Sequence, residues 1–320
     1  EAQLEVNSTL TPDEYVNDVL LGTGVEATNV QLTGSPVQIG HIFGFASDDF
    51  PIAEGLILST EVANNPANID DGCMQDFIDD GLEVSGDPDL LDIANSVPPL
   101  IGQSFSVSSV NDVCAIEFDF VATGDTISFN YVFGSNEYLA WINSQYNDIF
   151  GFFLSGPGIN GPYADNAINL AEVPDSDPQL AITISSVNPG TNGAYYIDNP
   201  ANDVLCQNGY TVKLTAESEV ECGETYHIRL AIADGTDTAL ESIVILESGS
   251  FESNSVVEVD LQINVGEDLD LNTPLIFEDC GEATLTFTRP IETIIDIEEM
   301  VIIDYSASTA TNGVEFTLLP

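Results

Sequence analysis

The sequence predicts a mainly β protein: a jelly-roll-like β-sandwich head with one short N-terminal helix, followed by an incomplete immunoglobulin-like β-domain. Several segments alternate apolar and polar residues with the period of two expected of half-buried strands. Clusters of Gly, Pro, Asn and Asp separate these segments, as turns do. Apolar residues make up 43% of the 320 residues, which is enough to form a core and argues against disorder.

One helix is expected at the start of the chain. Thr11 suits the N-cap and Pro12 suits the first helical position. Four apolar residues then recur at helical spacing before Gly22, namely Tyr15, Val16, Val19 and Leu20. The acidic stretch 62–104 that comes later is expected to be a solvated loop, with short helical turns near residues 74–78 and 88–94.

The strands of the sandwich are expected in the middle of the chain. Residues 116–120 and 127–133 carry Ile, Phe and Tyr at alternate positions, so both segments should point one apolar face inward. Residues 226–232 alternate in the same way. Residues 243–246 are apolar on both faces, which favours a central strand.

A domain boundary is expected between Ser250 and Ser255, so that residues 1–252 form the head and residues 253–320 a second β-module. Strands of that module are expected at 257–265, 283–288 and 299–306. Three or four strands leave a sheet open, with an apolar face and an unpaired edge exposed. We therefore expect the native polypeptide to continue beyond Pro320.

The charge balance excludes several classes of function. The chain has 54 Asp and Glu against three Lys and Arg, a formal net charge of −51. A basic footprint for nucleic acid or for anionic lipids is therefore missing. No apolar run reaches the ~18 residues of a membrane span, so no membrane insertion is expected. The chain begins without a signal peptide, as after its removal, and its charge requires screening by salt or bound cations.

The five cysteines show none of the CxxC spacings of zinc or redox sites. We expect disulfides, which indicate an extracytoplasmic compartment. The pairing Cys73–Cys114 with Cys206–Cys222 is one of three that these residues allow, and it leaves Cys280 over. The two histidines, His41 in an apolar segment and His227 on the outer face of a strand, do not form a nucleophilic triad by pattern, so no enzyme is expected.

Calcium is the expected cofactor. Carboxylate and amide oxygens suit this hard cation, and three clusters occur where strands end: Asn136 and Glu137, Asn147 and Asp148, and a third with Asp234, Asp237 and Glu241. Strands that end near Phe133 and Ile232 should bring the first and third clusters to one edge. The candidate ligands are Glu137, Asp148, Asp234 and Asp237, with Glu241 as a further one. Alternatively, these side chains cap turns and accept buried hydrogen bonds.

Aromatic residues in expected loops suggest contact with a glycan or another surface. Trp141, Tyr138 and Tyr146 lie between Asn and Asp residues, and amphipathic rings beside polar groups can hold sugars. The same rings can instead pack the loops against each other.

Ordered strings of residues connect the head to a known family. The main strings are YVFGSNEY (131–138) and NDIFGFFLSGPG (147–158), supported by ILST (57–60), LAEVP (170–174), YIDN (196–199), YHIRLAIAD (226–234) and GSF (249–251). Over residues 5–252 the sequence resembles the choice-of-anchor L domain family. Asn136 departs from the pattern, because the family commonly has a second Glu there, and this weakens a charge-based site at that position.

The tail is similar to the first half of a Calx-beta-type domain, through FEDCG (277–281), TFTR (286–289) and TATNGVEF (309–316). Together the two resemblances imply a large surface protein of gliding, type IX-secreting Gram-negative bacteria. The expected function is that of the distal, N-terminal region of a non-enzymatic adhesin or filament that attaches to surfaces or glycans. Its expected partners are further β-domains and the secretion and anchoring machinery. The alternatives are a calcium-dependent carbohydrate-binding module and an accessory domain of a secreted hydrolase.

Overall fold

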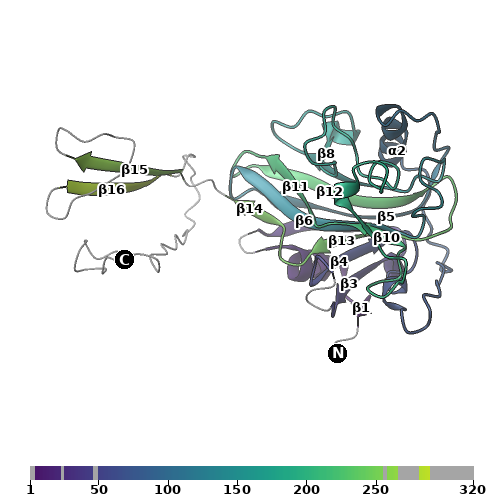
Figure 1. Ribbon diagram of the computed structural model, residues 1–320. Coiled ribbons are helices and arrows are strands. Elements are labelled where there is room, and N and C mark those ends of the chain that lie inside the picture. Colours follow the sequence, from purple (N-terminus) through teal and green to yellow (C-terminus); the bar gives the residue numbers. More distant parts are fainter. Residues whose placement is uncertain (1–3, 23–24, 46–49, 255–257, 266–280, 289–320) are drawn as a thin grey trace.

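Two antiparallel sheets stacked face to face form the head of the molecule (Figure 1). The computed structural model describes residues 4–22, 25–45, 50–254, 258–265 and 281–288. The five-stranded sheet has the order β2 (Ala27–Thr33), β5 (Val110–Val121), β12 (Thr225–Gly235), β7 (Ile149–Ser155), β8 (Ile168–Asn169). The expected β-sandwich is confirmed.

The second sheet has nine strands. Its main path runs through β1 (Glu5–Asn7), β3 (Ile39–Phe43), β4 (Glu54–Ser59), β13 (Ser242–Glu247), β6 (Thr126–Ser135), β10 (Gly209–Thr211) and β9 (Tyr196–Asp198). Two further strands also pair with β6, namely β11 (Leu214–Glu219) and β14 (Glu252–Asn254). Strand β13 lies between β4 and β6, which confirms the central position expected from its two apolar faces.

The core lies between the two sheets. The consecutive strands β5 and β6 contain the expected segments 116–120 and 127–133, and they lie in opposite sheets. The inward rings of β6 meet those of β7, as in the Phe129–Phe152 pair with ring centroids 5.1 Å apart. Phe251, fully buried beside β14, contacts three further core rings at centroid distances of 5.1–5.5 Å. The C-terminal edge of the head therefore completes the core.

The nine-stranded sheet also buries its outer face, which explains why β13 is apolar on both sides. Ile57, Ile243 and Ile245 form a second cluster there with residues of the connecting segments, including Ile52 and Leu205. The five-stranded sheet is covered on its outer face by α2 (Pro88–Leu100), which contacts β7 and β12.

The N-terminal helix is present, but most of it is π-helical. Thr11 caps α1 (Pro12–Glu14) in a capping box, as expected, and the chain continues as η1 (Tyr15–Leu20) with Tyr15, Val16, Val19 and Leu20 buried. The Leu21 amide donates to the Val16 carbonyl at 3.0 Å, which is the wider bond of a π-turn. Amides of the 249–251 turn donate to the carbonyls of Val19 and Leu20, so this winding joins the helix to the end of the head.

Helix α2 is longer than the short turn expected at 88–94. Asp87 caps it by accepting a hydrogen bond from the Leu90 amide, and Leu90, Ile93, Ala94 and Val97 form its buried face. No helix forms at 74–78, in the part of the chain that the structure describes. The remaining helical turns are η2 (Pro36–Gln38), η3 (Asn65–Ala67), η4 (Ala164–Asn166) and η5 (Gly193–Tyr195). Within the described ranges, no helix is both long and apolar enough to cross a membrane.

After the head, β15 (Glu258–Val265) and β16 (Gly281–Thr288) pair in a two-stranded antiparallel sheet of their own. These strands match the segments expected at 257–265 and 283–288. The third expected strand, 299–306, lies outside the described residues, as do Cys280 and most of the expected incomplete module.

A disulfide is present, as expected, but the expected pairing of Cys73 with Cys114 and Cys206 with Cys222 was wrong. Cys73 pairs with Cys206, at a Cα–Cα distance of 5.3 Å. Cys114 is an inward residue of β5 and is fully buried in the core, away from the exposed loop of Cys73, while the Cys222 thiol donates to the Thr123 carbonyl. The Cys206 amide donates to the Pro66 carbonyl, so the two loops that cover the outer face of the nine-stranded sheet meet there. The pairing of Cys73 with Cys114 fails because Cys114 faces the core between the sheets.

Candidate cation site

Acidic residues gather where the two sheets meet at one end of the sandwich. Strands β4, β6 and β12 end there, and their antiparallel neighbours β5, β7 and β13 begin there. Each of these strands carries a carboxylate at or next to that end: Glu61, Asp112, Glu137, Asp148, Asp234 and Glu241, with Asp237 in the turn after β12.

Several of these carboxylates continue the inward-facing positions of core strands. In β12, Ile228, Leu230 and Ile232 are fully buried, and Asp234 is the next alternate residue and equally buried. Asp112 stands in the same relation to Cys114 in β5, and Asp148 to Phe150 in β7. The last layer of the core is therefore acidic where the preceding layers are apolar.

Asp148 and Glu241 have hydrogen-bond partners on both oxygens. Asp148 accepts from the Gly235 amide at 2.9 Å and from the Ser242 hydroxyl at 2.7 Å, and so connects the two sheets. Glu241 accepts from the Ser59 hydroxyl at 2.6 Å and from the Gln207 amide group at 2.9 Å. For these two residues the structure supplies the buried hydrogen bonds that were the alternative to metal binding.

Three other candidates have carboxylate oxygens without hydrogen-bond partners among the described residues. Both oxygens of Asp234 are in this state, and so are one oxygen of Glu137 and one of Asp237. Asp234 is 0% exposed. Leaving a buried carboxylate unsatisfied costs several kcal/mol, so such a group either holds a proton or contacts a cation.

Sequence reasoning missed two members of the cluster. Glu61 and Asp112 each place a carboxylate oxygen close to one of Asp234, and these oxygens all lie within 4.8 Å of one another. Asp112 could have been found from its position two residues before the inward Cys114, and Glu61 from its position two residues after Ser59, where a strand ends.

Cationic side chains in the described ranges pair elsewhere. Lys213 lies 3.1 Å from Glu247, and Arg229 pairs with Asp87 and, at 3.8 Å, with Glu117. His227 contacts Asp119 on the outer face of the five-stranded sheet, and His41 pairs with Glu54. The acidic end of the sandwich thus has no basic side chain to offset its charge within the described part of the protein.

Burial raises the pKa of these carboxyl groups, and their mutual repulsion adds to the effect. The pKa of Glu61 rises to about 7, mainly through burial, and that of Asp112 to about 6. Burial and the neighbouring Asp148 raise the pKa of Glu137 to about 10. The pKa of Asp234 lies well above its ordinary value for the same reasons. Without a cation the cluster therefore retains protons at neutral pH.

The loop 136–148 presents aromatic residues above this cluster. Trp141 is 42% exposed and makes an edge-to-face contact with Tyr146, and its amide donates to the Glu137 carbonyl. Tyr138 is only 3% exposed and donates its hydroxyl to the Val187 carbonyl, so it packs the loop and offers no surface. The Asn147 side chain also stabilises the fold, because its oxygen accepts a hydrogen bond from the Ser185 amide.

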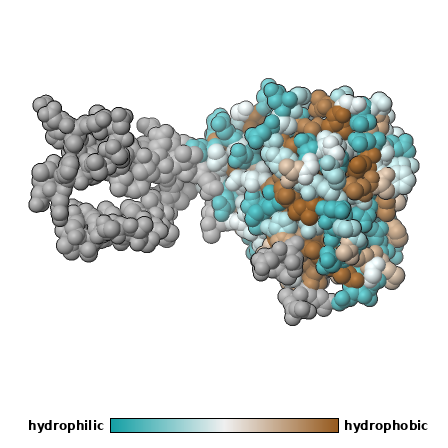
Figure 2. Space-filling view, viewed as in Figure 1, coloured by the Kyte–Doolittle hydropathy of each residue, from teal (hydrophilic) through white to brown (hydrophobic). Residues whose placement is uncertain are grey.

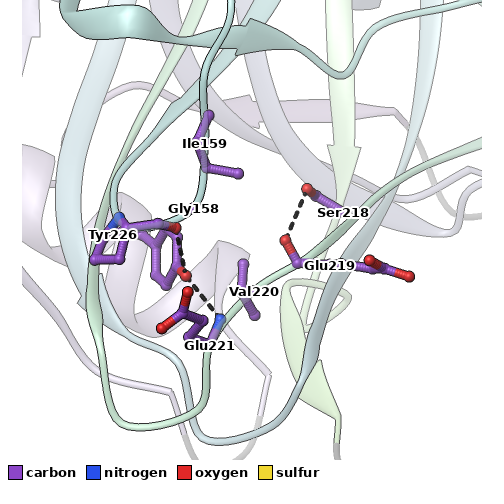
Figure 3. Close-up of a pocket in the computed structure, with 8 residues that line it drawn as sticks. Gly158, Ile159, Ser218, Glu219, Val220, Glu221 and Tyr226 are labelled. Atoms are coloured by element: carbon purple, nitrogen blue, oxygen red, sulfur yellow. Dashed lines mark hydrogen bonds between the residues drawn. The ribbon is translucent and has the colours of Figure 1, made fainter.

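Two cavities lie elsewhere on the head. One of about 470 Å³ is lined by Tyr226, whose hydroxyl donates to the Pro157 carbonyl and accepts from the Glu221 amide (Figure 3). A second, of about 550 Å³, contains Glu172, Tyr195 and Lys213. Neither lining includes a histidine or a cysteine.

The family assignment follows from comparison with known proteins. The model of the choice-of-anchor L domain matches residues 5–252, which comprise almost all of the sandwich. Neither the curated proteins nor the solved structures include a match to this chain. Domains of this family are non-catalytic as a kind and suggest a secreted or surface-anchored protein with an extracellular or cell-surface location. The chain therefore belongs to the choice-of-anchor L domain family.

Proposed function

We propose that this head is the attachment domain of a secreted surface adhesin, and that loop 136–148 is its contact surface. The observation that carries this proposal is the anchoring of an exposed aromatic loop by buried carboxylates at both of its ends. Glu137 opens the loop and Asp148 closes it, and both are buried. Trp141 and Leu139 between them are 42% and 45% exposed.

Exposed aromatic and aliphatic side chains on a fixed loop suit the binding of glycans or of another extracellular surface. Aromatic rings give a large contact area at a small cost in conformational entropy. The face seen in Figure 2 carries hydrophobic residues in patches between hydrophilic ones, so contact through a particular loop fits this surface better than contact through one broad apolar face.

Calcium is the cofactor that we propose for the base of this loop. Glu137, Asp148 and Asp237 are close enough for their charges to raise the pKa of Glu137. Glu137 and Asp237 each keep one oxygen without a hydrogen-bond partner in the described part of the chain. An ion that contacts these oxygens would fix both ends of the loop, and Glu241 would support it through the hydrogen bond from the Asn136 amide to the Glu241 carbonyl.

The wider setting of the proposal comes from the sequence resemblances. In it, the head is the distal, N-terminal part of a longer chain that continues through Calx-beta-type and further β-domains. The protein would leave a Gram-negative bacterium after signal-peptide removal, through type IX secretion, and would be anchored at the cell surface, where it contributes to adhesion or gliding motility.

The test of attachment uses the Trp141→Ala variant on a glycan array and on glass and cellulose surfaces, in the presence of calcium. The matched control is Phe77→Ala, which removes an aromatic ring of 61% exposure from a different loop. We expect Trp141→Ala to reduce retention at least tenfold and Phe77→Ala to leave it unchanged. Equal loss in both variants, or no retention of the wild type on any of these surfaces, would contradict the proposal.

Two related functions remain as alternatives, and the same protein distinguishes them. A calcium-dependent carbohydrate-binding module would bind soluble oligosaccharides and lose them with a chelator, without adhesion of the intact protein to surfaces. An accessory domain of a secreted hydrolase would be followed in its gene by a catalytic domain. The cavity beside Lys213 and Tyr195 gives the first alternative a second place to hold a sugar.

A further inference from the structure

We propose that Glu61, Asp112 and Asp234 form a calcium site of their own, separate from the base of the aromatic loop. One ion there would join the two sheets at the acidic end of the sandwich. This site goes beyond the proposed function, because it does not depend on attachment or on Trp141.

The spacing of the three side chains fits a single ion. Their carboxylate oxygens all lie within 4.8 Å of one another. Calcium–oxygen bonds are about 2.3–2.6 Å long, so ligands on opposite sides of one calcium ion are up to about 5 Å apart. One calcium ion can therefore contact all three residues with little movement of the side chains.

Asp234 supplies a second, independent indication of a ligand. It is 0% exposed, and although the Thr60 side chain lies near its carboxyl group, neither of its oxygens makes a hydrogen bond of ordinary geometry to the described residues. It lies beside a shift in the pairing of β12 with β5, between Ile232 and Asp234, and such bulges often turn side chains toward sites. On the other strand, Asp112 has the left-handed φ of 49°, which Asp and Asn tolerate better than most residues.

The ligand chemistry selects a hard cation. All three groups are carboxylates, whereas zinc and copper sites generally include His or Cys. Asp112 is 6% exposed and Glu61 is 3% exposed, so both are buried, as Asp234 is. Water molecules that enter with the ion would complete the six to eight oxygen ligands of calcium.

The site would also hold the acidic segment that follows β4. The second oxygen of Glu61 accepts a hydrogen bond from the Ile78 amide at 3.1 Å. Asp112 and Asp234 belong to the five-stranded sheet, and Glu61 follows a strand of the nine-stranded sheet. An ion on these residues would thus connect both sheets to segment 61–78, which is also held by the Cys73–Cys206 disulfide.

The test counts bound calcium in the purified protein after chelator treatment and dialysis into calcium, by mass spectrometry of the metal and by calorimetry. We expect half-saturation at roughly 0.1–1 mM, as in extracellular modules. Asp112→Asn and Glu61→Gln should each remove one equivalent, whereas Asp237→Asn should leave that equivalent in place. Asp165→Asn is the matched control, because Asp165 is exposed and also has a left-handed φ, of 55°.

A second measurement is hydrogen exchange at the Ile78 amide. Calcium should slow it at least tenfold in the wild type and in Asp237→Asn, and should have no effect in Asp112→Asn. If the wild type binds one ion and only Asp112→Asn and Glu61→Gln remove it, the site on Glu61, Asp112 and Asp234 is supported and the calcium ion proposed at the base of the aromatic loop is ruled out. If Asp112→Asn and Glu61→Gln bind as much calcium as the wild type, or the wild type binds none at 10 times the expected half-saturation, the inference is overturned. Should Asp112→Asn fail to fold, Glu61→Gln carries the same comparison.

Discussion

The buried acidic end of the sandwich predicts an unusual dependence of stability on pH. A carboxyl group whose pKa is higher in the folded than in the unfolded state binds more protons when folded, so stability falls as the pH rises. Glu61, Asp112 and Glu241 have pKa values raised to about 7, about 6 and about 8, respectively. In the presence of a chelator we therefore expect the protein to be most stable near pH 5 and to lose stability up to pH 8.

The size of the effect follows from the shift of a single residue. The pKa of Glu61 rises from its usual 4.5 to about 7. At about 1.4 kcal/mol per pKa unit, keeping this buried carboxylate ionised at pH 8 costs about 3 kcal/mol relative to the unfolded chain. For a domain of this size, that corresponds to a decrease in Tm of roughly 6–12 °C.

The assay is thermal unfolding followed by circular dichroism at pH 5 and pH 8, with chelator or with calcium, in about 0.5 M salt to screen surface charge. Calcium should restore most of the stability at pH 8 and have little effect at pH 5, where protons occupy the same oxygens. Glu61→Gln, which cannot ionise, should lose about 3 kcal/mol of the pH dependence in chelator. A Tm that stays constant or rises from pH 5 to pH 8 in chelator would refute the reasoning.

Three further predictions concern the fold. Replacing Cys206 by Ser opens a disulfide that spans 133 residues, and should lower the free energy of unfolding by about 5 kcal/mol in urea titrations. An unchanged free energy of unfolding would show that the two loops stay paired without the disulfide. Phe251→Ala empties the space between three core rings and should lower the free energy of unfolding by about 3–5 kcal/mol. A similar decrease is expected when the chain ends before β14, and a decrease below about 1 kcal/mol would show that the head is stable without β14. Gly235→Ala places a methyl group 2.7 Å from the Asn147 carbonyl oxygen and should displace the base of the aromatic loop, seen as altered Trp141 fluorescence, whereas Gly193→Ala, whose methyl group would lie 3.5 Å from the nearest atom, should not.

The alternating patterns predicted the sandwich well because each strand buries one face. Segments 116–120, 127–133 and 226–232 all became core strands with their apolar residues inward. The same rule predicted which end of the molecule collects charge, since Glu137, Asp148 and Asp234 follow or precede inward residues. The sequence carried less information about α2. This helix has 13 residues and one buried face, but two consecutive prolines near its end made it look shorter.

The sequence could not supply contacts between segments distant along the chain. Cys73 and Cys206 are 133 residues apart and meet only because their loops cover the same outer face of the nine-stranded sheet. Glu61 was overlooked for a related reason, since it lies next to Asp112 and Asp234 only once β4 and β5 are in opposite sheets. Patterns along one strand fix a residue's face, whereas long-range neighbours depend on the order of strands.

Under the proposed function, burying acids without bases would suit a domain that works outside the cell. Sensor proteins inside cells bind calcium at about 10⁻⁷–10⁻⁵ M, whereas extracellular modules need about 10⁻⁴–10⁻³ M. A site on Glu61, Asp112 and Asp234 with the weaker affinity of extracellular modules would stay empty before secretion. Its carboxylate oxygens would then be protonated or would repel one another. Arginine or lysine partners would stabilise the same end of the sandwich everywhere. With carboxylates alone, the proposed ions would fix the two sheets and the aromatic loop only where calcium is plentiful, as the proposed attachment outside the cell requires.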